Sequence, residues 1–487
     1  MLRFFRPISS GAIPIVVALA VRAIIPSSPA MAQGQVGSVQ LTPFVVGIIP
    51  VIGPNGGVGG VSIDAEGAIS RTERDESGRL HELRTRAMGE VPADVARESK
   101  MRKVSLARLE ALIVRHIEEK KPLPDEVQNL AGLTRIEFVL AYPERGDIVL
   151  AGPAEGWKLD AGGIAVGRTS GKPVLQLDDL LQALRSAEPA IKTGTLCSID
   201  PDVEGLKRLN KLLDQRGLVP SEALIESVEL ALGPQRIRLE GVEPSSHFAQ
   251  VMVAADYLMK RWAMGLEPAP VAGMPSYIEM LSKSTGRFPR NAMPRWWLAP
   301  RNEPLLHDAD RLAWQLRGRG VEVLTEDGFL SKTGQVVDLG KSHPLGEKWA
   351  ATMTEKYDEL SKHMPVLAEL RNCIDLAMVA TLLVKEDLPA RASCPLTLLM
   401  DGERLQLCQY HVPRTVSSRA SLTRRGRDWI LSVSGGVDID AWGALEDAEP
   451  SDALVKLRTD AAPIAKRDTP AVRADDNAHD AIAWWWD

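Results

Sequence analysis

Between residues 99 and 270, apolar residues recur alternately at the spacing of helix faces and in the short runs typical of strands. Leucine and isoleucine share one face of the segment from Ser105 to Lys120, and Ser105 can cap its first turn. Apolar runs at 136–142 and 147–152 flank the turn sequence Pro-Glu-Arg-Gly and predict a β-hairpin. A second hairpin is expected at 157–168, helices at 179–187, 201–215, after Ser221 and at 248–264, and single strands at 193–199 and 236–239.

Residues 285–445 carry a different pattern, which predicts antiparallel strands around a helical hairpin. The hairpin spans 347–384 and breaks at Met364-Pro365, because proline cannot continue a helix. Strands are expected at 295–299, 312–316, 321–324, 396–400, 405–409, 429–434 and 437–439. The predicted fold class is therefore α+β, with a mixed α/β N-terminal domain at 99–270 and an antiparallel β-rich domain at 285–445.

The two ends of the chain lack this periodicity. Residues 1–32 have a basic start, an apolar stretch and the small-residue site Ala30-Met31-Ala32, which predicts a signal peptide cleaved near Ala32 and export to the periplasm or exterior. Residues 33–98 form a Gly/Pro-rich segment and a charged connector. From residue 446 the polar composition predicts a disordered tail that ends in Trp484-Trp485-Trp486-Asp487.

No transmembrane helix is expected in the mature chain. A retained anchor needs about 20 uninterrupted apolar residues, and Arg22 interrupts the first apolar stretch. The uncharged run from Phe44 to Val61 contains two prolines and six glycines, which disfavour a helix within lipid.

Composition and charge narrow the function classes further. The 487 residues are 45% hydrophobic and 25% charged, as in ordinary globular proteins. Removal of residues 1–32 takes away three basic and no acidic residues, so the net charge moves from −6 to −9. This mildly acidic balance gives no electrostatic reason to expect a nucleic-acid partner.

The four cysteines predict neither a metal centre nor a bound cofactor, because they form no Cys-x-x-Cys or Cys/His grouping at zinc spacing. Cys394 and Cys408 bracket two apolar runs around Asp-Gly, which is a hairpin signal. A three-residue loop would place the two cysteines opposite each other and allow a disulfide, whereas a two-residue loop would shift them out of register.

Recognisable catalytic motifs are absent from the sequence, so no catalytic residue is assigned. Asp256 interrupts a strongly apolar helix pattern, and Lys260, one turn later, is its natural partner. A structural ion pair explains Asp256 better than an active acid does.

Arginine and tryptophan are interleaved between residues 287 and 319, in a pattern that could form a ligand-binding surface. Arginine forks suit carboxylate or sulfate groups, and tryptophan faces suit sugar rings or cations. Alternation on a strand is the competing explanation, with the indoles in the core and the arginines in water. The candidate residues are Arg295, Trp296, Trp297, Arg301, Trp314 and Arg317.

Trp484, Trp485 and Trp486 are the least ordinary feature of the sequence. Exposure of three consecutive indoles to water is unfavourable, so they require burial. They either dock on their own chain or bind a partner, which would be another protein or an envelope component.

Several strings resemble an uncharacterised bacterial family known as domain of unknown function 1598, whose members are mostly exported planctomycete proteins. They are Met101–Leu106, Asn129–Leu133 and Gly152–Trp157, and the resemblance covers residues 99–187, with Met293–Pro300 similar to longer members. It implies export and a shared fold, and no catalytic residue.

These observations together predict an exported protein that binds or assembles in the cell envelope or exterior and does not catalyse a reaction. The alternative is an exported enzyme, a hydrolase in particular, whose acids converge only in the fold. A deep pocket with Asp256 or His307 facing another titratable group would favour the enzyme.

Overall fold

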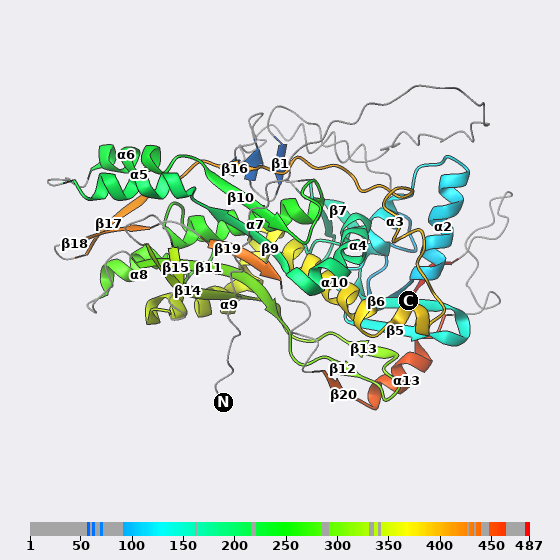
Figure 1. Cartoon of the computed structure of the whole chain (residues 1–487). Coiled ribbons are helices and arrows are strands. Elements are labelled where there is room, and N and C mark those ends of the chain that lie inside the picture. The colour runs from blue at the N-terminus through cyan, green and yellow to red at the C-terminus, as the bar shows by residue number, and fades with distance from the viewer. Residues whose placement is uncertain are drawn as a thin grey trace, which may run out of the picture. The chain divides into compact units, whose positions relative to one another are not determined.

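The computed structural model describes residues 91–160, 163–215, 221–284, 292–330, 342–425, 448–463 and 483–487, with short strands at 56–58, 61–63, 69–71, 336–338, 428–432 and 435–439 (Figure 1). The predicted signal peptide at 1–32 lies outside these residues, as does most of the segment at 33–98. Within that segment, β1 (Gly56–Val58), β2 (Val61–Ile63) and β3 (Ile69–Arg71) form a small antiparallel sheet.

Helices and two seven-stranded sheets make up most of the described residues, which confirms the α+β class. The first sheet has the strand order β20-β12-β13-β5-β6-β4-β21 and is antiparallel except between β12 and β20. Its strands are β4 (Ser99–Ser105), β5 (Phe138–Tyr142), β6 (Asp147–Ala154), β12 (Leu306–His307), β13 (Ala313–Gln315), β20 (Glu449–Pro450) and β21 (Trp485–Trp486).

The second sheet has the order β15-β14-β11-β19-β9-β10-β16, and only β11 and β19 run parallel. Its strands are β9 (Thr195–Asp200), β10 (Gln235–Glu240), β11 (Ala292–Arg301), β14 (Gly320–Leu330), β15 (Val336–Asp338), β16 (Thr415–Val416) and β19 (Gly435–Ile439). Each of the two sheets therefore combines strands from the 99–270 and 285–445 segments, and the predicted domain boundaries stay a prediction.

Helix α10 (Pro365–Lys385) is buried along most of its length and contacts α4 (Leu177–Thr193), α7 (His247–Ala263) and α9 (Pro344–His363). The break between α9 and α10 falls at Met364, where the following proline excludes helical backbone. This confirms the predicted helical hairpin. Among the described residues, no helix combines the length and apolar character that crossing a bilayer requires.

The predicted N-terminal elements are also present. Ser105 caps α2 (Leu106–Glu118) by accepting a hydrogen bond from the backbone N–H of Arg108. Ser221 and Ser246 cap α6 (Glu222–Leu232) and α7 in the same way. The second predicted hairpin is β7 (Trp157–Leu159) with β8 (Ala165–Gly167). The remaining elements are α3 (Asp125–Gln128), α5 (Val203–Leu213), α8 (Tyr277–Lys283), α11 (Leu388–Arg391), β17 (Ser421–Arg425) and β18 (Asp428–Ser432).

Three local predictions need correction. Residues 396–400 and 405–409 are turns and irregular backbone, because Leu396, Leu398 and Leu399 are buried in the helical core and do not pair as strands. Helix α5 begins at Val203, so Pro201 precedes it. The tail predicted as disordered contains α13 (Ala453–Asp460), whose Leu454 packs against the first sheet, while residues 464–482 lie outside the described residues.

Candidate functional sites

The C-terminal tryptophans form an added edge strand on the first sheet. Strand β21 pairs antiparallel with β4, with Trp485 opposite Val104 and Trp486 opposite Lys103. The backbone N–H of Ser105 donates to the carbonyl oxygen of Trp484 at 2.9 Å. The structure thus docks the segment Trp484–Asp487, here called the tail segment, on its own chain through main-chain hydrogen bonds.

The three indoles lie in different surroundings. Trp484 is only 5% exposed and belongs to the main hydrophobic core. Trp485 and Trp486 are partly buried, and each lies near an arginine. The guanidinium of Arg102 lies 4.5 Å from the ring centroid of Trp485, and that of Arg108 lies 5.9 Å from the ring of Trp486. The edge of β4, together with Arg102 and Arg108, provides the burial that the sequence required, and this surface is here called the groove beside β4.

Arg102 is the centre of this groove and has no exposed surface. Its Nε and one terminal nitrogen donate to the two carboxylate oxygens of Asp487, at 2.8 and 3.1 Å. Its remaining N–H groups donate to the backbone carbonyl oxygens of Val95, Arg97 and Ala131, at 2.8–2.9 Å. A fully bonded arginine fork of this kind is a geometrically specific receptor for a carboxylate.

The pKa of Asp487 reflects this pairing. Burial acts to raise it, but the hydrogen bond and charge of Arg102, with smaller effects of Ser99 and Lys103, bring it below its ordinary value. The pKa of Lys103 is lowered by burial, and Asp487 partly opposes that shift. The carboxylate of Asp487 is therefore held ionised. Sequence analysis missed Arg102 because its partner lies 385 residues away in the chain.

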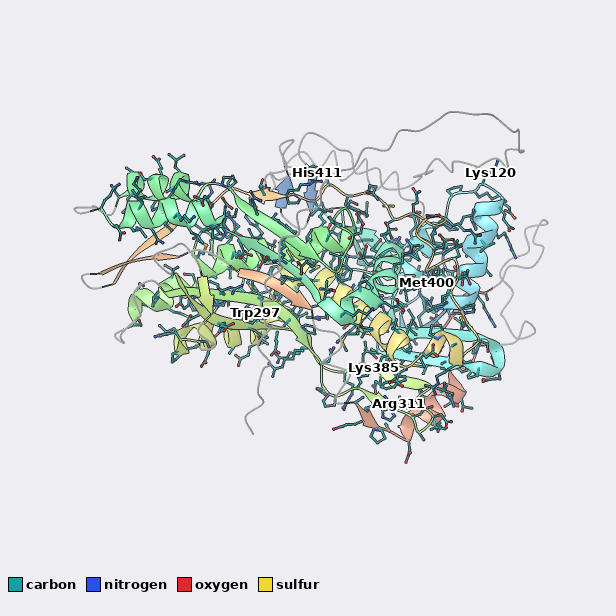
Figure 2. The ribbon with its side chains drawn as sticks, viewed as in Figure 1. Lys120, Trp297, Arg311, Lys385, Met400 and His411 are labelled. Carbon is teal, nitrogen blue, oxygen red and sulfur yellow. The ribbon has the colours of Figure 1, made fainter. Side chains whose placement is uncertain are left out.

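The arginines and tryptophans proposed as a ligand-binding surface lie in different environments. Trp296 and Trp314 have no exposed surface, so both rings belong to the hydrophobic core. Trp296 packs edge-on against Tyr277 and Trp349, with ring centroids 5.0 and 5.3 Å apart. Trp297, next along β11, is partly exposed (Figure 2). This alternation matches the competing explanation for the two buried indoles.

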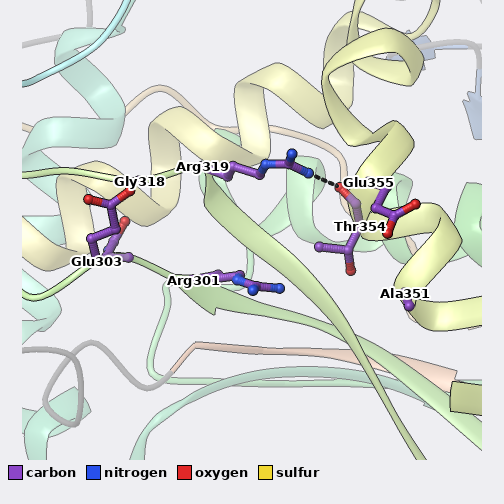
Figure 3. Close-up of a pocket in the computed structure, with 8 residues that line it drawn as sticks. Arg301, Glu303, Gly318, Arg319, Ala351, Thr354 and Glu355 are labelled. Carbon is purple, nitrogen blue, oxygen red and sulfur yellow. Dashed lines mark hydrogen bonds between the residues drawn. The ribbon is translucent and has the colours of Figure 1, made fainter.

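The arginines of the same segment also differ in their contacts. Arg317 donates to the carbonyl oxygen of Pro304 at 2.8 Å and lies 3.7 Å from a carboxylate oxygen of Glu303. Arg301 lies 3.3 Å from Glu322 and lines a cavity of about 410 Å³ (Figure 3). The remaining candidate, Arg295, lies on β11 and is partly buried. The other residues that line the cavity are Asn302, Glu303, Gly318, Arg319, Ala351, Thr354 and Glu355.

Asp256 and Lys260 form the predicted ion pair, with Lys260 Nζ 3.0 Å from a carboxylate oxygen of Asp256. Asp256 is fully buried, and Lys260 also donates to the carbonyl oxygen of Ile199 at 3.1 Å, which ties α7 to β9. Burial raises the pKa of Asp256 to about 6, and Asp200 adds to the shift while Lys260 opposes it. The pair is a structural link between a helix and the second sheet.

We expect Asp256 to make stability fall as pH rises from about 4 to about 6. The carboxyl group binds its proton more tightly in the folded state (pKa about 6) than in the unfolded chain (pKa about 3.9). The proton therefore stabilises the folded state fully below about pH 4, and this stabilisation is lost as the pH rises to about 6. Urea unfolding of Asp256→Asn at several pH values should lack this fall, and loss of the ion pair should lower its stability above about pH 6, where the wild-type carboxylate is ionised. Glu204→Gln, at an exposed carboxylate, should keep the wild-type slope. An unchanged slope in Asp256→Asn would show that another group titrates.

A buried cluster around His247 was not found from the sequence. Nδ1 of His247 lies 2.9 Å from Asp179, and Nε2 lies 3.6 Å from Glu369. Burial lowers the pKa of His247, but these two carboxylates together raise it well above its ordinary value. Both ring nitrogens therefore carry protons and face carboxylates, which suits a charged structural centre that joins α4, α7 and α10. His307, which the sequence singled out, bonds the backbone oxygen of Asp308 through Nδ1, and its Nε2 lies 3.2 Å from a terminal nitrogen of Arg311.

The structure holds Cys394 and Cys408 as free thiols, as it does Cys197 and Cys373. The predicted hairpin between Cys394 and Cys408 is not formed. Cys394 lies near the backbone of Ile148, whereas the Cys408 thiol lies against Asp178.

We therefore expect all four cysteines to react with an alkylating agent in the unfolded protein without prior reduction. Intact-protein mass spectrometry with and without reduction should give the same mass. A difference of two alkyl groups would show a disulfide, and peptide mapping would then identify the pair.

Comparison with known proteins gives one family match. A model of the family described as "Protein of unknown function (DUF1598)" matches residues 197–277, from β9 through α7 to the start of α8. No curated protein and no solved structure matches the chain. The matched residues follow the 99–187 stretch on which the sequence resemblance was based, and they include the Asp256–Lys260 pair. This match thus confirms the predicted similarity to the DUF1598 family.

Proposed function

We propose that this is an exported binding and assembly protein of the cell envelope or exterior, in which the tail segment of one copy binds the groove beside β4 of another. The observation that carries the proposal is the receptor geometry of Arg102. Its buried fork recognises the carboxylate of Asp487, while β4 recognises the adjoining backbone. Addition of an extended segment to a sheet edge is a recurring mode of protein–protein recognition.

A second copy is the partner that this groove fits best, because the segment with matching chemistry belongs to the chain itself. Backbone pairing with β4, burial of Trp484 and the Arg102–Asp487 pair would be the same in either arrangement. Docking within one chain has the advantage of a high effective concentration. Assembly therefore depends on release of the tail segment.

Complementary variants test this proposal. One variant, truncated before Trp484, has an open groove and no tail segment, and the other, Arg102→Met, keeps the tail segment and loses the receptor. We expect these two variants to form a one-to-one complex in size-exclusion chromatography with light scattering. Two truncated copies should not associate.

A synthetic Ala-Trp-Trp-Trp-Asp peptide gives an independent test with the truncated protein alone. It should bind the truncated chain more tightly than the full chain, and the same peptide ending in asparagine should bind at least tenfold more weakly, since it lacks the side-chain carboxylate that Arg102 pairs with. Absence of peptide binding to the truncated, folded protein would reject the groove as a receptor.

Export rests on the sequence features of residues 1–32 and on what the family resemblance implies. Fractionation of cells that express the full chain should place the protein outside the cytoplasm, with residues up to about Ala32 removed. Cytoplasmic protein with an intact N-terminus would contradict this part of the proposal and leave the groove unaffected.

A further inference from the structure

The cavity of about 410 Å³ lies between the end of β11, the start of β14 and α9 (Figure 3). Two guanidinium groups extend into it, that of Arg301 from the end of β11 and that of Arg319 from the loop just before β14. Carboxylates of Glu303 and Glu355 lie at its borders. The volume suits a small ligand of about monosaccharide size.

The two arginines are neutralised to different extents. Arg301 lies 3.3 Å from Glu322, and the pairing is partly exposed. Arg319 donates one hydrogen bond, to the backbone carbonyl oxygen of Thr354 at 3.3 Å, and has no carboxylate within ion-pair distance among the described residues. Four of the five N–H donors of Arg319 therefore remain available to a ligand.

Asn302 also lines the cavity, but its side-chain amide is enclosed by protein and does not face the open space. Both polar atoms of its side-chain amide are buried and have no hydrogen-bond partner among the described residues. An amide in this state is unfavourable, because a buried polar group without a hydrogen bond loses its interaction with water and gains nothing in return.

Side chains on the far side of the cavity wall hold the backbone next to Arg319. Arg135 donates to the carbonyl oxygen of Gly318 at 2.9 Å and is itself held by the buried Asp375 at 3.0 Å. Gly318 has φ +96°, and a Cβ atom there would lie 2.7 Å from the backbone nitrogen of Glu303. Only glycine fits this position without strain, which lets the loop before Arg319 pass close to the backbone of Glu303.

Helix α9 is fastened to the same strand. The Thr354 hydroxyl accepts a hydrogen bond from the backbone N–H of Val323 and donates to the carbonyl oxygen of Ala350, both at 2.9 Å. The Thr354 carbonyl that receives Arg319 is therefore held in place relative to β14. The cavity is built on rigid elements, as a binding site requires.

We propose that this cavity binds a small ligand through a carboxylate or sulfate group, which the guanidinium groups of Arg301 and Arg319 hold. Arginine forks match the oxygens of both groups. The buried Trp296 and Trp314 take no part in the site. This inference is independent of the groove beside β4.

Isothermal titration calorimetry of the full chain with sodium sulfate, sodium glucuronate and glucose tests the proposal. Sulfate or glucuronate should bind saturably, and glucose, which lacks the oxyanion, should bind at least tenfold more weakly. Arg319→Gln should weaken binding of the oxyanion by about 10- to 100-fold, as expected for loss of hydrogen bonds to a charged group. Arg238→Gln, at an exposed arginine paired with Glu240, is the matched control and should bind as wild type.

Glu355→Gln provides a second test, because the expected result is tighter binding and a misfolded variant would bind more weakly. Removal of this carboxylate from the border of the cavity should tighten oxyanion binding severalfold, because it removes a repulsive charge. Weaker binding in Glu355→Gln would show that the carboxylate accepts a hydrogen bond from the ligand and would overturn the assignment to an oxyanion. The proposal also fails if neither sulfate nor glucuronate binds, or if Arg319→Gln binds as wild type.

Discussion

Replacement of Arg102 by methionine is expected to lower the free energy of unfolding by about 3–5 kcal/mol, because it removes one partner of a buried ion pair. Arg102 is fully buried and uses all five N–H groups, two on Asp487 and three on backbone carbonyl groups. Methionine replaces the aliphatic part of the arginine side chain, but it leaves these oxygens without donors. Trp485 also loses the guanidinium over its ring.

Urea unfolding at equilibrium gives the stability change, and acrylamide quenching of tryptophan fluorescence reports release of the tail segment. Arg108→Met is the matched control. Arg108 also contacts the segment, with its guanidinium 5.9 Å from the ring of Trp486, and donates to the preceding carbonyl oxygen of Ala483 at 2.9 Å, but it is partly exposed. We expect a loss of about 1 kcal/mol there. Equal losses of stability in the two variants would mean that Arg102 contributes no more to docking of the tail segment than Arg108 does.

Local elements could be predicted from the sequence because their signals lie within a few residues. Ser105 caps α2 through the N–H three residues later, and Pro365 sets the break between α9 and α10. The Asp256–Lys260 pair follows from one helical turn. In each case the partners are fixed by the geometry of a single element, so the pattern is sufficient.

The groove beside β4 could not be predicted, because its parts come together only in the fold. The sequence shows that three indoles need burial, but it does not show that β4 offers an open edge or that Arg102 faces Asp487. The same limit explains the error at 396–409. Apolar alternation there matches a hairpin, yet the leucines are buried in a helical core that the local pattern does not reveal.

Replacement of Trp296 by alanine is expected to lower the free energy of unfolding by about 3–5 kcal/mol, the range for loss of a large aromatic side chain from a core. Trp296 has no exposed surface and packs edge-on against Tyr277 and Trp349, which belong to α8 and α9. The indole therefore joins β11 to two helices. Its removal leaves a cavity that these elements can close only by moving apart from their other contacts.

Trp297→Ala is the matched control, because adjacent residues of a strand point to opposite faces. Trp297 is partly exposed, so we expect a loss of about 1 kcal/mol in urea unfolding. The pair of variants also separates the two roles that the sequence allowed for this segment. If Trp296 contacted a ligand, Trp296→Ala would weaken glucuronate or sulfate binding with little change in stability, whereas a core residue gives the reverse. Arg319→Gln should instead weaken sulfate or glucuronate binding with little change in stability, since its side chain is exposed and, among the described residues, bonds one carbonyl group.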